Sequence, residues 1–434
     1  MDYLEMIKSV PSHRLALIEN NCPHTYGELA SEASMLRESL SPEDGPSLAP
    51  IRESSVCRQL LYFIAYSGTH KIPLLIPHDV CHLTDDIALN ARGGGIPPAG
   101  FSSGGIPPAG ISSDGIPPAA SMAVLTSGTT GRPRIWYRSF ESWHSFFPIQ
   151  NTVFGITGST RMFIHGSLAF TGNLNMCLGL LYAGAAIITA DPVHPFAWDQ
   201  SIGRHCADSI YLIPSKLRLM ARFVSCVRPA IKEIVSGSQS LGLSDVKNLK
   251  QIYPNCRCTL YYGASELSYV SYLTDSEMDD NCARIGKPFP GVRTDIADGL
   301  IYVHTPYGAE GISMPYSAGD MGCQDADGCL IFLGRRDHVY NIHGRKISAV
   351  KIENSLQDIS GVAEAAVTLE KDSILAAHVV MWDLPDPQVY SRTAAALNRQ
   401  LSLRLESWEI PRKYYFPASL PKSSSGKRAE AVVY

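Results

Sequence analysis

The sequence contains no run of apolar residues long enough to cross a bilayer. Its most apolar stretch, residues 177–189, has about thirteen residues, whereas a transmembrane helix needs roughly 20. The first eight residues include Asp2 and Glu5 and lack the apolar run of a secretory signal. We therefore expect residues 177–189 to be buried core, and the protein to be cytoplasmic with no integral membrane segment.

Charge is also scarce. Charged residues make up 18% of the chain and the net charge is −4, so its overall charge gives no reason to bind nucleic acid or anionic lipid. Hydrophobic residues make up 45%, which is typical of a folded globular protein. Because the net charge is negative, a polyanionic ligand would have to be bound by a few local positive or hydrogen-bonding groups.

The 11 cysteines form no zinc-binding pattern. The closest pair is Cys256-Arg257-Cys258, and neither a second pair nor a histidine cluster stands at zinc-finger spacing from it. We expect free thiols that are mostly buried.

A chain of 434 residues has room for two or three domains of about 100 to 200 residues each. Strand-like segments alternate with helical ones up to about residue 286, which predicts an α/β fold with mainly parallel strands. Shorter strands separated by Asp-Gly turns follow, and they predict a β-rich unit. We predict a large multi-layer α/β domain with a small β-rich subdomain over residues 1–336, and a small, mobile α+β domain over 337–434.

A ten-residue repeat begins at Gly95, returns at Gly105 and starts a third copy at Gly115. Each copy opens with Gly-Ile-Pro-Pro-Ala, so stiff Pro-Pro segments alternate with flexible Gly- and Ser-rich segments. Such a sequence offers few apolar side chains that could pack into a core. We predict an exposed insertion over about residues 93–120. A partner-binding role for the Pro-Pro units is the alternative to a neutral expanded loop.

A hydroxyl-rich glycine loop follows the strand-like residues 122–125. It reads Thr126-Ser127-Gly128-Thr129-Thr130-Gly131-Arg132-Pro133-Arg134. The hydroxyls can donate to phosphate oxygens, the glycines let backbone N–H groups approach, and Arg134 adds a fixed charge. No Gly-Lys-Ser/Thr closes the loop, so it is not a Walker-type loop. It predicts phosphate binding, with a polar turn after a buried strand as the alternative.

A second anion-binding candidate stands near the end of the chain, where Lys427 follows a flexible Ser-Ser-Ser-Gly stretch. Between the two lie three further segments: Tyr262-Gly263-Ala264-Ser265-Glu266, Gly319-Asp320 and Gly334-Arg335-Arg336-Asp337. In this order the segments resemble those of the adenylate-forming superfamily, which comprises acyl-CoA synthetases, adenylation domains and luciferase-like AMP-binding enzymes. Bacterial acyl-CoA ligases resemble the chain most.

The resemblance implies ATP and Mg²⁺ as cofactors. Arg134 stands where the family has lysine, so the charge is kept in a planar, bulkier group. Tyr262 and Gly263 would contact adenine, Ser265 would contact phosphate, and Glu266 would hold magnesium. The phosphates themselves would be bound by Thr126, Ser127, Gly128, Thr129, Thr130 and Gly131.

The same resemblance implies roles for residues around the nucleotide and the acid. Ser238 would belong to the adenine pocket and Gly237 to the substrate pocket. Asp320 would accept hydrogen bonds from both ribose hydroxyls, and Arg335 would contact the ribose-phosphate side.

The resemblance implies three further roles for residues of the C-terminal domain. Asp337 would be the interdomain hinge, and Gly344 would line a tunnel for a phosphopantetheine thiol. Lys427 would be catalytic, reaching the carboxylate and the α-phosphate. Asn341 departs from the family pattern, which has lysine there.

Phe170 is the predicted gate of the acyl pocket, with simple core packing as the alternative. No acidic residue occurs between Thr160 and Ala190, so an amino acid's ammonium group would find no partner there, and burying it unpaired is costly. A fatty or other uncharged carboxylic acid is therefore favoured over an amino acid.

The implied function is ATP-dependent activation of a carboxylic acid to an acyl-adenylate, with release of pyrophosphate and transfer to a thiol, for which coenzyme A (CoA) is the expected acceptor. One alternative is a stand-alone adenylation enzyme that loads an acyl or peptidyl carrier protein. A non-catalytic adenylate-binding regulatory protein is the alternative of another class.

Overall fold

A computed structural model of the protein describes residues 1–40, 47–77, 115–126, 134–191, 194–279, 281–342 and 345–421, with Asp337 and Asp372 given by their backbone alone. The repeat as far as residue 114 lies outside these ranges. So do seven predicted site residues: Ser127, Gly128, Thr129, Thr130, Gly131, Gly344 and Lys427.

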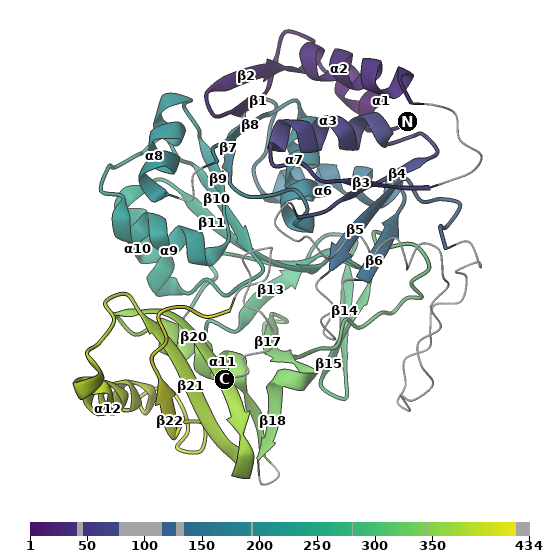
Figure 1. Cartoon of the computed structure of the whole chain (residues 1–434). Coiled ribbons are helices and arrows are strands. Elements are labelled where there is room, and N and C mark those ends of the chain that lie inside the picture. Colours follow the sequence, from purple (N-terminus) through teal and green to yellow (C-terminus); the bar gives the residue numbers. More distant parts are fainter. Residues whose placement is uncertain are drawn as a thin grey trace.

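One large sheet runs through the molecule (Figure 1). In chain order its strands are β1 (Leu15–Glu19), β2 (Cys22–Thr25), β7 (Arg161–Ile164), β8 (Ala186–Thr189), β9 (Ser209–Tyr211), β10 (Glu233–Gly237), β11 (Arg257–Ala264), β12 (Ser268–Thr274), β13 (Arg284–Pro288), β14 (Arg293–Ala297), β15 (Leu300–His304), β16 (Asp320–Gln324) and β17 (Leu330–Arg335). Within the described ranges this sheet has 13 strands, in the spatial order β14-β15-β16-β17-β13-β12-β11-β10-β9-β7-β8-β1-β2.

The direction of the strands changes along this sheet. Strands β1, β8, β7, β9, β10 and β11 pair in parallel, whereas the pairs from β11 to β14 are antiparallel. The predicted parallel α/β core and the β-rich region after Gly286 are therefore confirmed. The β-rich region continues the same sheet, because β13 pairs with both β12 and β17.

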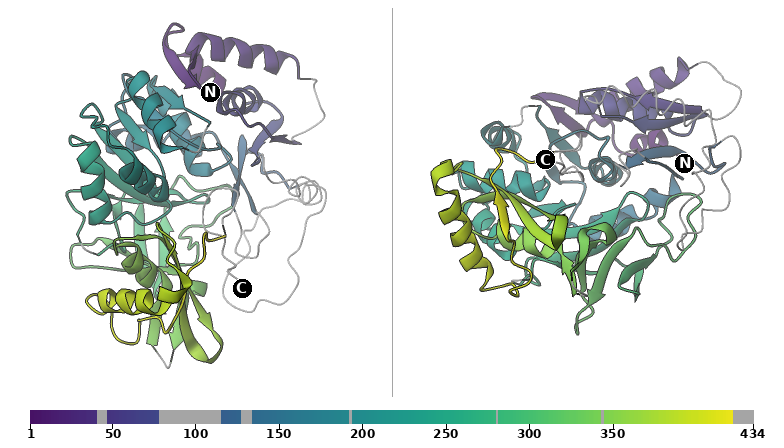
Figure 2. Two further views of the ribbon diagram at one scale, coloured as in Figure 1. Left: turned by 60° about the vertical axis from the view of Figure 1, so that its left-hand side comes forward. Right: turned by 60° about the horizontal axis from the view of Figure 1, so that its bottom comes forward.

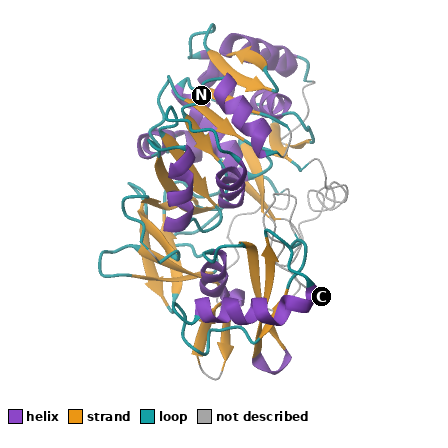
Figure 3. Cartoon of the chain, turned by 90° about the vertical axis from the view of Figure 1, so that its left-hand side faces the viewer, coloured by secondary structure: helices purple, strands orange, loops and turns teal. Residues whose placement is uncertain are grey.

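Helices cover both faces of the parallel strands (Figures 1 and 3). They are α1 (Tyr3–Lys8), α2 (Tyr26–Glu38), α3 (Val56–Tyr66), α5 (Glu141–His144), α6 (Phe147–Val153), α7 (Thr171–Ala183), α8 (Pro195–Arg204), α9 (Pro214–Phe223) and α10 (Leu243–Ile252). On β7, Met162 joins the core beneath α1, α3 and α7, and its neighbour Phe163 joins the core beneath α8, α9 and α10. Because successive side chains of a strand point to opposite faces, both faces are buried.

The apolar stretch 177–189 is core, as predicted. It is divided between the end of α7 and strand β8, and almost all residues of the stretch are buried. Gly184 separates the two in the left-handed conformation, with φ of 73°. Among the described residues, no helix is both long enough and apolar enough to cross a membrane.

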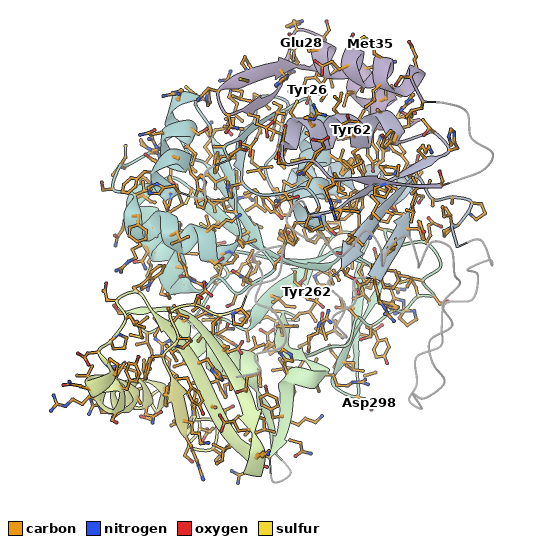
Figure 4. The ribbon with its side chains drawn as sticks, in the orientation of Figure 1. Tyr26, Glu28, Met35, Tyr62, Tyr262 and Asp298 are labelled. Atoms are coloured by element: carbon orange, nitrogen blue, oxygen red, sulfur yellow. The ribbon has the colours of Figure 1, made fainter. Side chains whose placement is uncertain are left out.

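Helix α2 begins with a capping box formed by Thr25 and Glu28. The Thr25 hydroxyl accepts from the Glu28 backbone N–H at 3.2 Å, and the Glu28 carboxylate accepts from the Thr25 backbone N–H at 2.8 Å. Figure 4 labels Glu28 at the exposed edge of the molecule. The cap fixes where α2 begins, directly after strand β2.

A second sheet carries the strands that flank the glycine loop. It has the order β3 (Ser47–Ile51), β4 (Lys71–Leu75), β5 (Met122–Thr126) and β6 (Arg134–Arg138). Strands β5 and β6 are antiparallel, and Thr126 is paired with Arg134. The two ends of the predicted phosphate loop are thus held next to each other on a sheet.

After β17 a short 3₁₀ helix, η1 (Arg336–His338), leads into the C-terminal part of the chain. This part contains the hairpin of β18 (Val339–Ile342) and β19 (Arg345–Ser348), helices α11 (Ala349–Gln357) and α12 (Tyr390–Leu401), and the sheet of β20 (Val362–Glu370), β21 (Ile374–Met381) and β22 (Lys413–Tyr415). It has a hydrophobic core of its own. The predicted hinge residue Asp337 lies in η1, and its role stays a prediction.

The C-terminal part lies against the large sheet (Figure 2). The Ser348 hydroxyl donates to the Leu333 carbonyl oxygen at 2.6 Å, and the Ser240 hydroxyl donates to the Asn354 amide oxygen at 2.6 Å. An aromatic contact joins the two parts as well, with the ring centroids of Phe223 and Trp382 6.3 Å apart.

Candidate active site

The candidate site forms where β11 ends. A β-bulge interrupts the pairing of β11 with β12 between Tyr262 and Gly263, and bulges of this kind re-aim side chains. A Cβ added to Gly263 would lie 2.4 Å from the Ser268 carbonyl oxygen, so only glycine fits there. The bulge turns the Tyr262–Glu266 segment toward the strands beyond it.

Tyr262, Asp320 and Arg335 form one hydrogen-bonded group. The Tyr262 hydroxyl donates to Asp320 Oδ2, and Arg335 Nε lies 3.3 Å from Asp320 Oδ1. Asp320 and Arg335 are direct partners in the β16–β17 pair. Figure 4 shows Tyr262 at the centre of the molecule, where β11 meets the strands of the β-rich region.

The Asp320 carboxylate is 6% exposed. Burial, followed by the nearby Asp320 charge, raises the pKa of Tyr262 well above its usual value, so the phenol remains a donor. An ionised carboxylate has about four acceptor positions, and these two contacts leave room for further donors. Asp320 can therefore accept from hydroxyl groups of a ligand.

Glu266 lies among these charges. Burial raises the pKa of its carboxyl group above the usual value, while the charges of Arg335 and Arg138 act to lower it and Asp320 acts to raise it. The Glu266 carbonyl oxygen accepts from the Ala309 N–H at 2.8 Å, which fixes its backbone. A partly desolvated carboxylate of this kind gains from a nearby cation.

Arg134 reaches the same region from β6. Burial and the charge of Glu266 raise the pKa of Tyr316, whereas the charges of Arg134 and Arg335 act to lower it. All three groups are thus close enough to act on one phenol. Two cations and two carboxylates converge here, which suits a phosphate ligand with a bound metal ion.

A buried arginine supports the site from behind. Arg138 is fully buried and donates to the Ser265 carbonyl oxygen, the Tyr307 carbonyl oxygen and the Ser142 hydroxyl. Its guanidinium also lies 5.3 Å from the centre of the Trp143 ring. Nothing in the sequence pattern marked Arg138, since a charge at the end of a short strand is usually solvated.

The Ser265 hydroxyl points to the first turn of α7. It donates to Thr171 Oγ1 at 2.9 Å, and Phe170 is the N-cap residue of that helix. The bulged segment is therefore hydrogen-bonded to the residue that follows the predicted gate Phe170.

A pocket of about 80 Å³ opens between them. Its walls carry four aromatic rings, those of Trp143, Phe170, Tyr261 and Tyr269, and the polar side chains of Thr171, Asn175, Ser238 and Ser265. The structure thus brings Phe170, Ser238, Gly263 and Ser265 together, all of them predicted site residues. Trp143, Asn175, Tyr261 and Tyr269 were not predicted.

Two glycines make this pocket possible. A Cβ on Gly237 would lie 2.5 Å from the Tyr261 ring, and one on Gly172 would lie 2.6 Å from the Tyr211 hydroxyl and 2.8 Å from that of Tyr261. Gly237 therefore acts behind the wall, by giving room to Tyr261, whose ring lines the pocket. Ser238, next along the chain, has a φ of 69°, which turns it into the pocket.

No group of three or more metal-binding side chains occurs in the described part of the chain. Glu266 is the residue that fits a magnesium ion, since Mg²⁺ is usually held by one or two carboxylates together with substrate phosphates and water. An ion held in this way would neutralise phosphate charge. The metal role of Glu266 stays a prediction.

Two family models match the chain. The model of the AMP-binding enzyme covers residues 113–311, and that of the AMP-binding enzyme C-terminal domain covers residues 351–427. The second match begins within α11, 14 residues after the predicted hinge at Asp337.

Curated relatives point in the same direction. An uncharacterized acyl-CoA ligase of Bacillus subtilis, YhfT, is 29% identical over 325 residues, which is 71% of this chain and 67% of that protein. The anguibactin system regulator of Vibrio anguillarum is 26% identical over 348 residues, 70% of this chain but only 33% of the regulator. The chain thus matches about a third of that larger relative.

Solved structures share the fold. The o-succinylbenzoate CoA synthetase MenE of B. subtilis, in complex with its acyl-adenylate intermediate, has a TM-score of 0.79 at 19% identity, covering 99% of this chain and 97% of that one. The same synthetase in complex with ATP and magnesium ion has a TM-score of 0.78 at 18% identity, covering 99% and 98%. At this level of identity the likeness establishes the fold.

Proposed function

Since this chain belongs to the AMP-binding enzyme family of adenylate-forming ligases, we propose that it activates a carboxylic acid with ATP and passes the acyl group to a thiol. The acid's carboxylate oxygen attacks the α-phosphorus, which yields an acyl-adenylate and pyrophosphate. The thiol then displaces AMP and yields a thioester. The chain is in this reading an AMP-forming acid–thiol ligase.

The observation that carries the proposal is the Tyr262–Asp320–Arg335 group beside Glu266 and the aromatic pocket. Asp320 offers acceptors for the two ribose hydroxyls, and Tyr262 supplies a ring for adenine. The pocket reaches Ser265 and Thr171, so the acid and the nucleotide would meet at the bulged segment.

Bringing two anions together is the electrostatic problem of this reaction. Arg134 and Arg335 place fixed positive charge at the site, and preorganised charges stabilise the developing transition state. Magnesium, when bound, adds charge neutralisation at the phosphates, and Glu266 would hold it. Lys427 would approach from the C-terminal domain after rotation about Asp337.

CoA is the proposed acceptor, in accord with the naming of the B. subtilis relative as an acyl-CoA ligase. A carrier protein bearing phosphopantetheine presents the same thiol and is the second candidate. Comparing thioester formation with free CoA and with a purified carrier protein that bears a free phosphopantetheine thiol decides between the two.

The test is acid-dependent pyrophosphate release from Mg-ATP. We expect release with one class of acid, and a loss of about 100-fold or more in Glu266→Gln and in Lys427→Ala. Asp298→Asn is the matched control, because Asp298 is an exposed turn residue that Figure 4 shows at the far end of the β14–β15 hairpin. Binding of ATP without pyrophosphate release in the presence of any of the acids would instead identify a non-catalytic adenylate-binding protein.

A further inference from the structure

Two polar groups in the wall of the pocket have no hydrogen-bond partner among the described residues. They are the side-chain oxygen of Asn175 and the hydroxyl of Tyr269. Both residues are only 4% exposed. Buried polar groups in folded proteins are almost always paired, so two unpaired groups on residues that line one pocket call for a partner, which a ligand of that pocket can supply.

Three other hydroxyl groups of the same pocket, those of Tyr261, Ser265 and Ser268, are paired. Tyr261 and Tyr211 share a hydrogen bond of 2.6 Å between their hydroxyls, and the Ser265 hydroxyl donates to Thr171. The Ser268 hydroxyl donates to the Tyr307 carbonyl oxygen at 3.1 Å and accepts from Trp143 Nε1 at 3.0 Å. Asn175 and Tyr269 are therefore exceptions within a well-bonded wall.

The polar character continues behind Asn175. Gly179 lies four residues further along α7, on the same face of the helix, and a Cβ there would lie 2.3 Å from Gln150 Nε2. Gln150 is fully buried, and both of its amide atoms lack a partner in the described structure. The unpaired polar atoms of Gln150 thus lie behind the pocket wall, on the α7 face that Asn175 shares.

The shape of the pocket is restrictive as well. Its volume of about 80 Å³ is bounded by flat rings, and the rings of Tyr261 and Tyr269 meet edge to face, with centroids 4.5 Å apart at 87°. Flat walls of this kind pack well against another aromatic ring.

We propose that the acid is a compact aryl carboxylic acid carrying a ring hydroxyl or amino group, which pairs with Asn175 and Tyr269. This inference rests on the proposed function and narrows the sequence-based expectation of a fatty or other uncharged acid. A ring hydroxyl donates to the Asn175 oxygen or exchanges a hydrogen bond with Tyr269, whereas an alkyl chain leaves both groups unpaired.

The test measures kcat/KM for pyrophosphate release with benzoate, the hydroxybenzoates, the aminobenzoates, octanoate and palmitate. We expect a hydroxy- or aminobenzoate to exceed both benzoate and octanoate by on the order of tenfold or more, because an acid without the hydrogen-bonding group leaves buried polar groups unpaired. A fatty acid as good as the best aryl acid would overturn the proposal.

Two variants address the residues themselves. Tyr269→Phe and Asn175→Leu should remove most of the preference for the substituted acid over benzoate, measured as the ratio of the two kcat/KM values within each variant. Tyr62→Phe, on the outer helix α3, is the control, and a thermal unfolding scan confirms that each variant is folded. An unchanged preference in both pocket variants would refute the assignment.

Calorimetric binding of the same acids, in the presence of a non-hydrolysable ATP analogue, separates this inference from the proposed function. If Tyr269→Phe weakens the binding of a substituted aryl acid, and the unmodified protein releases no pyrophosphate from ATP with that acid, the pocket assignment is supported and the ligase is rejected. Release with fatty acids alone would support the ligase and reject the aryl acid. The absence of both binding and release with aryl acids would reject the inference.

Discussion

The guanidinium of Arg138 holds the carbonyl oxygen of Ser265, a residue 127 positions later in the chain, through Nε at 3.1 Å and Nη2 at 2.9 Å. Arg138 ends the strand that leaves the phosphate loop, and Ser265 precedes Glu266. One buried side chain therefore ties the two halves of the candidate nucleotide site together. Because the contact is made to backbone, it fixes the position of the segment whatever ligand is bound.

Replacing Arg138 by methionine should destabilise the protein and lower its activity. Burial lowers the pKa of Arg138 to about 10, so the group is still charged at neutral pH. Its loss leaves the buried Ser265 and Tyr307 carbonyl oxygens without their donor, which should cost about 3 kcal/mol of unfolding free energy. Urea unfolding measures this cost. Arg58→Met is the matched control, since the Arg58–Glu53 pair is half exposed and should contribute less than about 1 kcal/mol.

Tyr262→Phe should raise the KM for ATP by about threefold to tenfold and affect kcat less. The change removes the hydrogen bond to Asp320 but keeps the ring, and a single hydrogen bond to a charged group contributes about 1.5–3 kcal/mol at most. Steady-state kinetics with varied ATP give both parameters. An unchanged KM would place the nucleotide away from Asp320. Tyr62→Phe, labelled on α3 in Figure 4 far from Tyr262, is the control.

Activity should fall on acidification earlier than it would for an ordinary glutamate. Burial raises the pKa of Glu266, and the cation-binding form is the carboxylate. As the pH decreases toward the raised pKa, protonation begins above the usual glutamate pKa of about 4.3, and affinity for Mg-ATP decreases. The pH profile of kcat/KM for ATP, measured with and without Glu266→Gln, checks this. The same acidic limb in the variant would assign it to another group.

The sequence was most informative where chemistry depends on local order. The loop ends Thr126 and Arg134 and the motif residues Tyr262, Asp320 and Arg335 were predicted, and the structure brings the last three into one group. The parallel core was also predictable, because its strands alternate with helices along the chain.

Residues that act through distant contacts could not be predicted. Arg138 looks like an ordinary strand-end charge until its partner 127 residues away is known. Asn175 and Tyr269 fit the core patterns of α7 and β12. Only the folded structure shows that both line a pocket, and that the Asn175 side-chain oxygen and the Tyr269 hydroxyl have no partner among the described residues. Gly237 was predicted to belong to the substrate pocket, and only the structure shows that it makes room for the Tyr261 ring, which lines that pocket.

Lys216 provides a final prediction, on stability. Its amino group lies 2.9 Å from both His165 Nδ1 and the His165 carbonyl oxygen, and burial lowers its pKa to about 8. In the unfolded chain a lysine has a pKa near 10.4. Between about pH 8 and pH 10 the unfolded state therefore binds more protons than the folded state, so the contribution of Lys216 to stability rises with pH in this window, by up to about 3 kcal/mol. We expect the unfolding free energy of the protein to increase relative to that of Lys216→Met as the pH increases from 8 to 10, as measured by urea unfolding.

The control is Lys247→Met, at an exposed position of α10. Its difference in unfolding free energy from the unmodified protein should not depend on pH. The same pH-independent difference in Lys216→Met would show that the buried amino group is not the source.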